Sequence, residues 1–120
     1  MPAYDKIMVT YRVKPGAEKK FEALLRIHWP TLNRMKLVKN EPSVVFRGEW
    51  HRRTFYVEIF SWLNADAVSH AHHLPEVMKV WEPMAALVEK WRGRSAMEFT
   101  PVCELNLGFK AARGKNAAKS

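Results

Sequence analysis

The segment from Thr54 to Trp62 is apolar on both of its faces, and this feature limits the fold of the chain more than any other. Its residues suit a strand, in which successive side chains point to opposite sides of a sheet. One face would carry Phe55, Val57 and Ile59, and the other would carry Tyr56, Phe60 and Trp62. An antiparallel strand with one face in water alternates more cleanly between apolar and polar residues. We therefore expect a sheet that is covered on both faces.

Apolar periodicity predicts the elements around this strand. Alternation predicts further strands at residues 7–13, 43–50 and 96–103, and helical spacing predicts helices at 17–35, 65–73 and 75–91. Asn64 is expected to cap the second helix. Pro30 is expected to kink or interrupt the first helix, and Pro83 to bend the third. The polar residues 51–53 are expected to form the tip of a hairpin between the two middle strands.

The order strand, helix, strand, strand, helix, strand favours an α+β fold, a ferredoxin-like βαββαβ sandwich with an antiparallel sheet. The helices of such a sandwich cover only one face of the sheet. Because the third strand is apolar on both faces, the uncovered face is predicted to meet a second copy of the chain. We expect a homodimer that forms through the sheet faces.

The length of 120 residues fits one domain, which we expect at residues 1–105, followed by a basic, disordered tail at 106–120. The single cysteine, Cys103, excludes an internal disulfide and a cysteine-based zinc site, and we interpret it as an inert buried thiol. No apolar run approaches the ~20 residues of a membrane span, and the N-terminus does not read as a signal peptide. We expect a cytoplasmic protein without a membrane partner.

The formal net charge of +8 raises the question of a nucleic-acid partner. Half of the excess lies in residues 110–120, which hold four basic residues and no acids. Elsewhere basic and acidic residues are interspersed, and no aromatic-basic motif of the RNA-binding kind occurs. The charge therefore indicates a solvated surface with a basic tail, and no nucleic-acid partner is expected.

Three histidines, His70, His72 and His73, follow one another closely in the second predicted helix. Asp66, His70 and His73 would share one helix face, where imidazole and carboxylate groups can bind a metal. No fourth ligand is evident in the sequence, and the same spacing fits a solvated helix face, which we favour. His72 would lie beside the buried stripe and point toward the sheet or the rim of a pocket. No metal and no other cofactor is expected.

Several motifs resemble those of a known superfamily over roughly residues 4–105. They are Lys14-Pro15-Gly16 before a Glu/Lys-rich helix, the SW-x-N-x-x-A stretch from Ser61 to Ala67, the AHHLP stretch, and the helix that contains Trp81. On these motifs the chain resembles the dimeric α/β-barrel superfamily, and within it the antibiotic biosynthesis monooxygenase-like domains. The resemblance implies that two sheets pack face to face as a dimeric α/β barrel. It also implies a pocket in each subunit between its own sheet and helices.

The activities in this superfamily include cofactor-free oxygenation of polycyclic aromatic phenols and degradation of haem. In the quinone-forming oxygenases, Trp62 would match a functional tryptophan, but Glu58 stands where an asparagine is expected and Val68 where a tyrosine is expected. For haem degradation, Val9 and Trp81 stand where an asparagine and a histidine are needed. The resemblance therefore implies an oxygenase-like protein more readily than a haem-degrading one.

Glu58 shares a strand face with Tyr56, Phe60 and Trp62, so its carboxylate would lie among aromatic rings. If that face lines the pocket, desolvation would make Glu58 a usable general base. The alternative is a salt bridge from Glu58 to Arg12 or Arg47 on a neighbouring strand.

A set of candidate site residues follows from this arrangement. Glu58 and His72 are the predicted catalytic residues, and Tyr56, Phe60 and Trp62 are the predicted substrate-binding residues. His28 is interpreted as a half-buried helix residue, His51 as a turn residue, and Trp81 as part of the core.

The pattern favours a cofactor-independent monooxygenase-like protein that acts on or binds a small aromatic or polyketide-like molecule. A non-catalytic small-ligand-binding or stress-response barrel is the second interpretation. A haem- or metal-binding barrel is the third.

Overall fold

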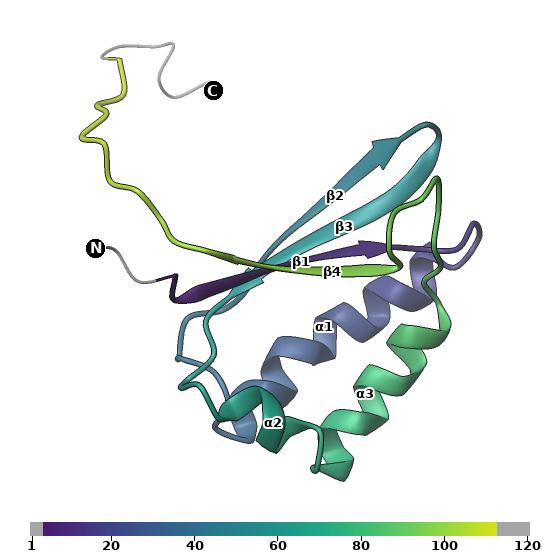
Figure 1. Cartoon of the computed structure of the whole chain (residues 1–120), viewed down its shortest axis with the longest axis horizontal. Coiled ribbons are helices and arrows are strands. Elements are labelled where there is room, and N and C mark those ends of the chain that lie inside the picture. Colours follow the sequence, from purple (N-terminus) through teal and green to yellow (C-terminus); the bar gives the residue numbers. More distant parts are fainter. Residues whose placement is uncertain (1–3, 113–120) are drawn as a thin grey trace.

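The computed structural model describes residues 4–112 of the chain. The element order is β1 (Lys6–Arg12), α1 (Glu18–Arg34), β2 (Val44–Trp50), β3 (Arg53–Phe60), α2 (Ala67–Ala71), α3 (Pro75–Ala86) and β4 (Met97–Val102). The four strands form one antiparallel sheet in the order β2-β3-β1-β4 (Figure 1). The predicted ferredoxin-like α+β fold is therefore confirmed.

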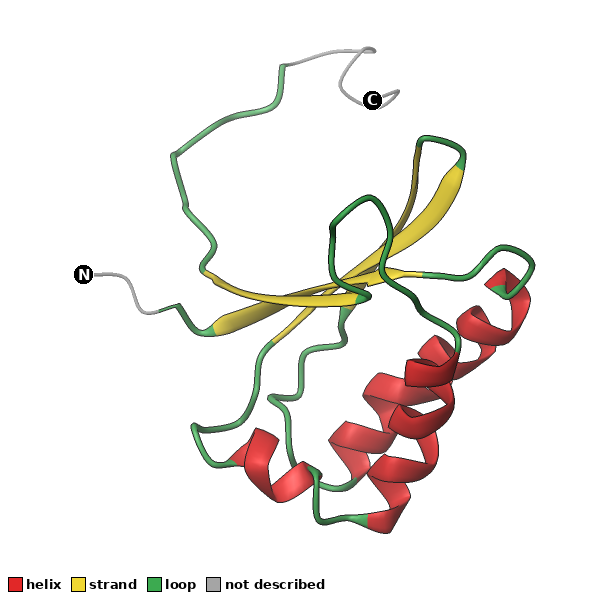
Figure 2. Ribbon diagram, turned by 45° about the vertical axis from the view of Figure 1, so that its right-hand side comes forward, coloured by secondary structure: helices red, strands yellow, loops and turns green. Residues whose placement is uncertain are grey.

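The helices all lie on one side of the sheet, and α1 packs beside α3 (Figure 2). The side chains between the two layers are the core, and they alternate along each strand as the period of a strand requires. Val9 and Tyr11 of β1 and Tyr56 and Phe60 of β3 point into this core and are almost completely buried. Phe21 of α1 packs between the rings of Tyr11 and Tyr56.

The other face of the sheet carries the second set of apolar side chains. The register pairs Val44 with Ile59 and Phe46 with Val57, so these four residues share that face. Val44 is 53% exposed and Phe46 is 56% exposed. Apolar side chains therefore occur on both faces of the sheet, and the helices of residues 4–112 cover only one of them. We call the opposite face the outer face.

The connection between β2 and β3 is a two-residue turn at His51 and Arg52, because Trp50 pairs with Arg53. Both turn residues have positive φ, 50° and 65°, as a type I′ hairpin turn requires. The predicted hairpin tip is confirmed, although Arg53 belongs to the strand and not to the turn.

Neither helix is interrupted at its proline: α1 continues through Pro30 and α3 through Pro83, each as a single helix. The cap of α2 is shifted as well. Asp66 occupies the cap position, and the Asn64 side chain accepts a hydrogen bond from the Asp66 backbone N–H at 3.1 Å. Asn64 therefore shapes the turn before the helix.

The third helix is shorter than predicted, since it ends at Ala86 and not near Trp91. After the helix, the chain pairs with the end of β1. The backbone N–H of Lys14 donates to the Leu87 carbonyl at 2.8 Å, and the backbone N–H of Glu89 donates to the Arg12 carbonyl at 2.9 Å. This pairing is between residues far apart in sequence, and helical periodicity alone does not reveal it.

Beyond β4, residues 103–112 contain no helix or strand and run away from the sheet (Figure 1). Leu105, Leu107 and Phe109 are exposed there, and Cys103 is half-buried, not fully buried as expected. The expected disorder of residues 113–120 lies outside the described residues. Within residues 4–112, no helix combines the length and the apolar character that crossing a membrane needs.

Candidate functional site

The carboxylate of Glu58 is completely buried between the sheet and α1. Glu58 lies on the helix-facing side of β3, opposite Val9 of β1. The Tyr11 hydroxyl donates to Oε1 of Glu58 at 2.7 Å, and Nδ1 of His28 lies 2.9 Å from Oε1 and 3.1 Å from Oε2. A buried carboxylate is tolerated only where donors replace the water that it loses, and here β1 and α1 each supply one.

Glu58 does not form the alternative salt bridge with Arg12 or Arg47, so that prediction is wrong. Arg12 lies on the outer face and pairs with Glu98. Arg47 shares the helix-facing side with Glu58, but at the exposed edge strand it pairs with Glu22 at 2.7 Å. Glu58 therefore has no arginine or lysine partner within residues 4–112.

His28 is buried, with 3% of its surface exposed, and not half-buried as predicted. Its second ring nitrogen, Nε2, lies 2.9 Å from Nε1 of Trp81 on α3. An indole nitrogen can only donate, so Nε2 accepts. The ring proton of His28 is therefore on Nδ1, which donates it to Glu58. This tautomer follows from the two hydrogen bonds together.

Four aromatic side chains, Phe60, Trp62, His72 and Trp81, continue from His28 toward the surface, and we call them the aromatic cluster. The ring centroids of His28 and Phe60 are 5.9 Å apart, those of Phe60 and Trp62 5.1 Å, and those of His72 and Trp81 4.9 Å. All three pairs meet edge to face, an arrangement that aromatic rings favour. His72 is exposed, and Trp62 and Trp81 are half-buried. The cluster thus connects the buried carboxylate with the protein surface.

Tyr56 does not belong to this cluster. Its hydroxyl donates to Glu22 at 2.6 Å, near the start of α1. Residues along a strand advance about 3.3 Å each, so Tyr56 and Trp62 lie about 20 Å apart. The predicted site residues therefore fall into two places: Phe60, Trp62 and His72 lie together, whereas Tyr56 lies at the other end of the core.

Three residues of the site were not predicted: Tyr11, His28 and Trp81. His28 does lie on the apolar stripe of its helix, where an isolated imidazole needs a partner, so a signal was present. The contact of Tyr11 with Glu58 depends on the register of β1 against β3, which the sequence does not reveal.

The two buried tyrosines, Tyr11 and Tyr56, both have a raised pKa. Burial raises the pKa of Tyr11 well above its usual value of 10.0, and the charge of Glu58 and their hydrogen bond raise it further. Burial also raises the pKa of Tyr56, with added effects from its hydrogen bond to Glu22 and the charge of that carboxylate. That hydrogen bond in turn lowers the pKa of Glu22.

Within the described part of the chain, no three histidine, cysteine, aspartate or glutamate side chains come close enough together to hold a metal ion. Asp66, His70 and His73 are all exposed on the short helix α2 or at its ends.

The fold occurs in several solved structures. A mutant of SnoaB, a cofactor-independent oxygenase from Streptomyces nogalater, superposes with a TM-score of 0.62 at 17% identity, covering 87% of this chain and 96% of that one. A protein from Bacteroides thetaiotaomicron, named as an unproven antibiotic biosynthesis monooxygenase, gives a TM-score of 0.57 at 15% identity and covers 90% and 95%. One named in the same way, from Caulobacter crescentus, gives 0.52 at 15% identity and covers 85% and 94%.

These likenesses show that the chain has the fold of the antibiotic biosynthesis monooxygenase-like domains, as its motifs implied. No family model and no curated protein matches the sequence.

Replacing Tyr11 by phenylalanine tests the burial of Glu58. Glu58 loses a donor, so we expect the free energy of unfolding at neutral pH to fall by about 1–3 kcal/mol. Because the pKa of Tyr11 is raised in the folded state, this group contributes stability that is complete below pH 10. That contribution is lost as the pH rises from 10 through the raised pKa. Tyr11→Phe should therefore also reduce the loss of stability between pH 10 and pH 11, as measured by urea unfolding. Tyr4, which is 69% exposed, provides the matched control Tyr4→Phe. Equal stability curves for the two variants would contradict this account.

Proposed function

We propose that the protein is a homodimeric, cofactor-independent oxygenase-like protein that binds a small aromatic molecule at the aromatic cluster. The observation that carries the proposal is the path of two hydrogen bonds from Glu58 through His28 to Trp81, which ends in this cluster. A buried carboxylate that orients an imidazole is a common arrangement for moving a proton. The shared fold with a cofactor-independent oxygenase supports the proposal.

The aromatic cluster offers the surfaces that a flat ligand needs. Trp62 and Trp81 are half-buried indoles on two different elements, and their ring centroids are 6.3 Å apart. A planar ring can replace part of their mutual contact and stack on either indole. The exposed imidazole of His72 lies against Trp81, where it can bind a hydroxyl group of the ligand. Phe60 closes the inner side, and Tyr56 has no part in this site.

The proposed chemistry begins at Nε2 of His28. When a phenolic ligand displaces the Trp81 N–H, this nitrogen is free to accept the hydroxyl proton, and the carboxylate of Glu58 stabilises the resulting imidazolium. The electron-rich phenolate then reacts with molecular oxygen. One oxygen atom enters the ring to give a quinone, and the other leaves as water, so the reaction needs no further reductant.

Oxygen consumption tests the catalytic proposal. With a panel of naphthols and hydroxyanthracenes, the wild-type protein should consume oxygen, and Glu58→Gln should lower the rate by about a hundredfold or more. His70→Ala is the matched control, because His70 is an exposed histidine near the cluster but outside it. Its rate should equal that of the wild type. Equal rates for Glu58→Gln and wild type would remove Glu58 from the mechanism.

A non-catalytic ligand-binding barrel is the second candidate. The complete burial of Glu58 favours it, because Tyr11 and His28 already occupy the carboxylate. Binding of the same phenols without oxygen consumption by the wild-type protein would select this candidate.

The homodimer is proposed from the outer face of the sheet, where Val44 and Phe46 are exposed and no helix of residues 4–112 covers them. Light scattering at micromolar concentration should give about twice the chain mass of 14.0 kDa. Phe46→Glu should shift the protein toward the monomer, because it places a charge in an apolar contact. Ile27→Glu is the control, since Ile27 is similarly exposed, at 48%, but lies on α1. A wild-type protein that stays monomeric would contradict the dimer.

A further inference from the structure

Two turns of the chain share the sequence pattern W-x-x-R: residues 50–53 between β2 and β3, and residues 91–94 between α3 and β4. In each turn the tryptophan pairs with the arginine across the base. The two central residues of both turns have positive φ: 50° and 65° in the first, and 49° and 75° in the second. The two turns therefore have the same left-handed backbone, although they lie about 40 residues apart in sequence.

The two turns contact each other in a reciprocal way. The guanidinium of Arg53 lies over the ring of Trp91, and that of Arg94 lies over the ring of Trp50, each 5.0 Å from the ring centroid. The two indoles meet edge to face with their centroids 5.2 Å apart. Each arginine thus stacks on the tryptophan of the other turn, and the pairs hold the turns beside each other.

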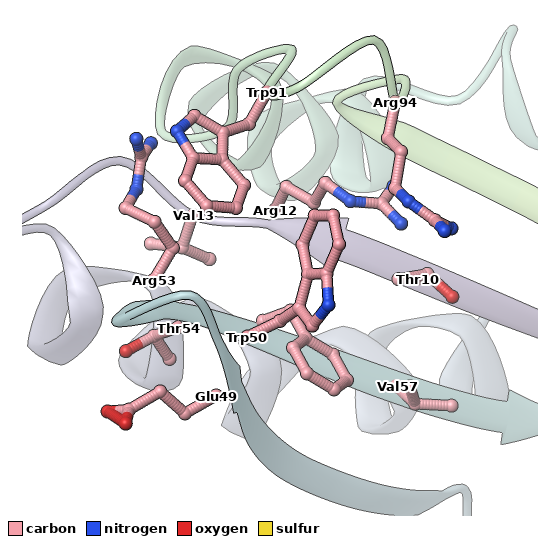
Figure 3. Close-up of a pocket in the computed structure, with 11 residues that line it drawn as sticks. Thr10, Arg12, Val13, Glu49, Trp50, Arg53, Thr54, Val57, Trp91 and Arg94 are labelled. Atoms are coloured by element: carbon pink, nitrogen blue, oxygen red, sulfur yellow. The ribbon is translucent and has the colours of Figure 1, made fainter.

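A cavity of about 370 Å³ lies between these turns and the outer face of the sheet (Figure 3). Thr10, Arg12 and Val57 contribute from the sheet, and Trp50, Trp91 and Arg94 from the turns. The volume is within the range of sites for small molecules. The cavity is separate from the aromatic cluster, which lies on the other side of the sheet.

The arginines of this cavity differ in how their charges are used. Arg12 pairs with Glu98, and Arg53 pairs with Glu89. Arg94 is exposed and forms no ion pair with any residue in 4–112. Within residues 4–112, the buried Nε of Arg53 also has no hydrogen-bond partner. Glu49 is the one acidic residue of the lining, and in Figure 3 it lies on the Thr54 side, away from Arg12 and Arg94.

We propose that this cavity binds a small planar aromatic carboxylate. The planar guanidinium of Arg94 can pair with both oxygens of a carboxylate, and the indole of Trp50, which is 38% exposed, can stack on the ring. On this side of the cavity, the guanidinium of Arg94, which has no ion pair within residues 4–112, lies beside the partly exposed indole of Trp50. That combination fits an aromatic anion better than a neutral ring or a simple inorganic anion.

The cavity borders the proposed dimer contact, because Val57 lines the cavity and also pairs with Phe46. Along the outer face, Val44 and Ile59 pair with each other at one end of the sheet, and Trp50 and Arg53 pair at the other. The exposed Val44 lies toward the first end, and most of the cavity, with Trp50 and Arg53, lies toward the second. A partner subunit on the apolar end can leave the cavity accessible.

Binding of 1-naphthoate by the full-length protein tests the proposal, with calorimetry for affinity and NMR of the five indole N–H groups for location. We expect the signals of Trp50 and Trp91 to shift, and 1-naphthalenemethanol to bind at least about tenfold more weakly. Arg94→Ala should weaken naphthoate binding by a similar factor. Arg94→Lys, which keeps the charge but not the paired geometry, should weaken it less. Arg34→Ala, an exposed arginine on α1, should change nothing.

Three results would overturn the site. One is equal affinity of naphthoate and naphthalenemethanol for the wild-type protein. Another is a shift of the Trp62 and Trp81 signals in place of Trp50 and Trp91, which would assign the ligand to the aromatic cluster. The third is unchanged naphthoate affinity in Arg94→Ala with a lowered melting temperature, which would make the paired turns a structural clasp only. None of these depends on oxygen consumption, so the site and the proposed oxygenase activity can fail separately.

Discussion

The buried carboxylate of Glu58 is the constraint on which the interior of this protein depends. An ionised group without water is costly, and here a phenol from β1 and an imidazole from α1 replace the lost hydration. These two donors join β1 and α1 to the same carboxylate. The Trp81 indole, which can only donate to Nε2, leaves the ring proton of His28 on Nδ1. Trp81 then completes the arrangement from α3. One carboxylate thereby links the sheet to both long helices.

The two faces of the sheet have different tasks in this account. The helix-facing side contains the carboxylate and the aromatic cluster, where proton transfer is proposed. The outer face contains an exposed apolar end and, at the hairpin end, a cavity lined by tryptophan and arginine. A strand that is apolar on both faces, such as β3, is what this division requires.

The element order and fold class were predictable because apolar periodicity is local. The errors arose where contacts between distant residues decide the outcome. The helix α3 stops at Ala86 because the next residues pair with β1, and Glu58 binds His28 because of its register and the position of α1. Arg47 was a reasonable partner by sequence, yet Glu22 lies closer at the exposed edge. The paired W-x-x-R turns were visible in the sequence, but only the structure shows that they meet.

The position of the ring proton of His28 tests the central claim most directly. Nitrogen-15 NMR of the imidazole distinguishes a protonated from an unprotonated ring nitrogen. We predict that Nδ1 of His28 is protonated and Nε2 is not. Scalar coupling across the hydrogen bonds should then connect Nδ1 with the Glu58 carboxylate and Nε2 with the Trp81 indole. Trp81→Phe should remove the second interaction and leave the first. A proton on Nε2 in the wild-type protein would contradict the path from Glu58 to the aromatic cluster.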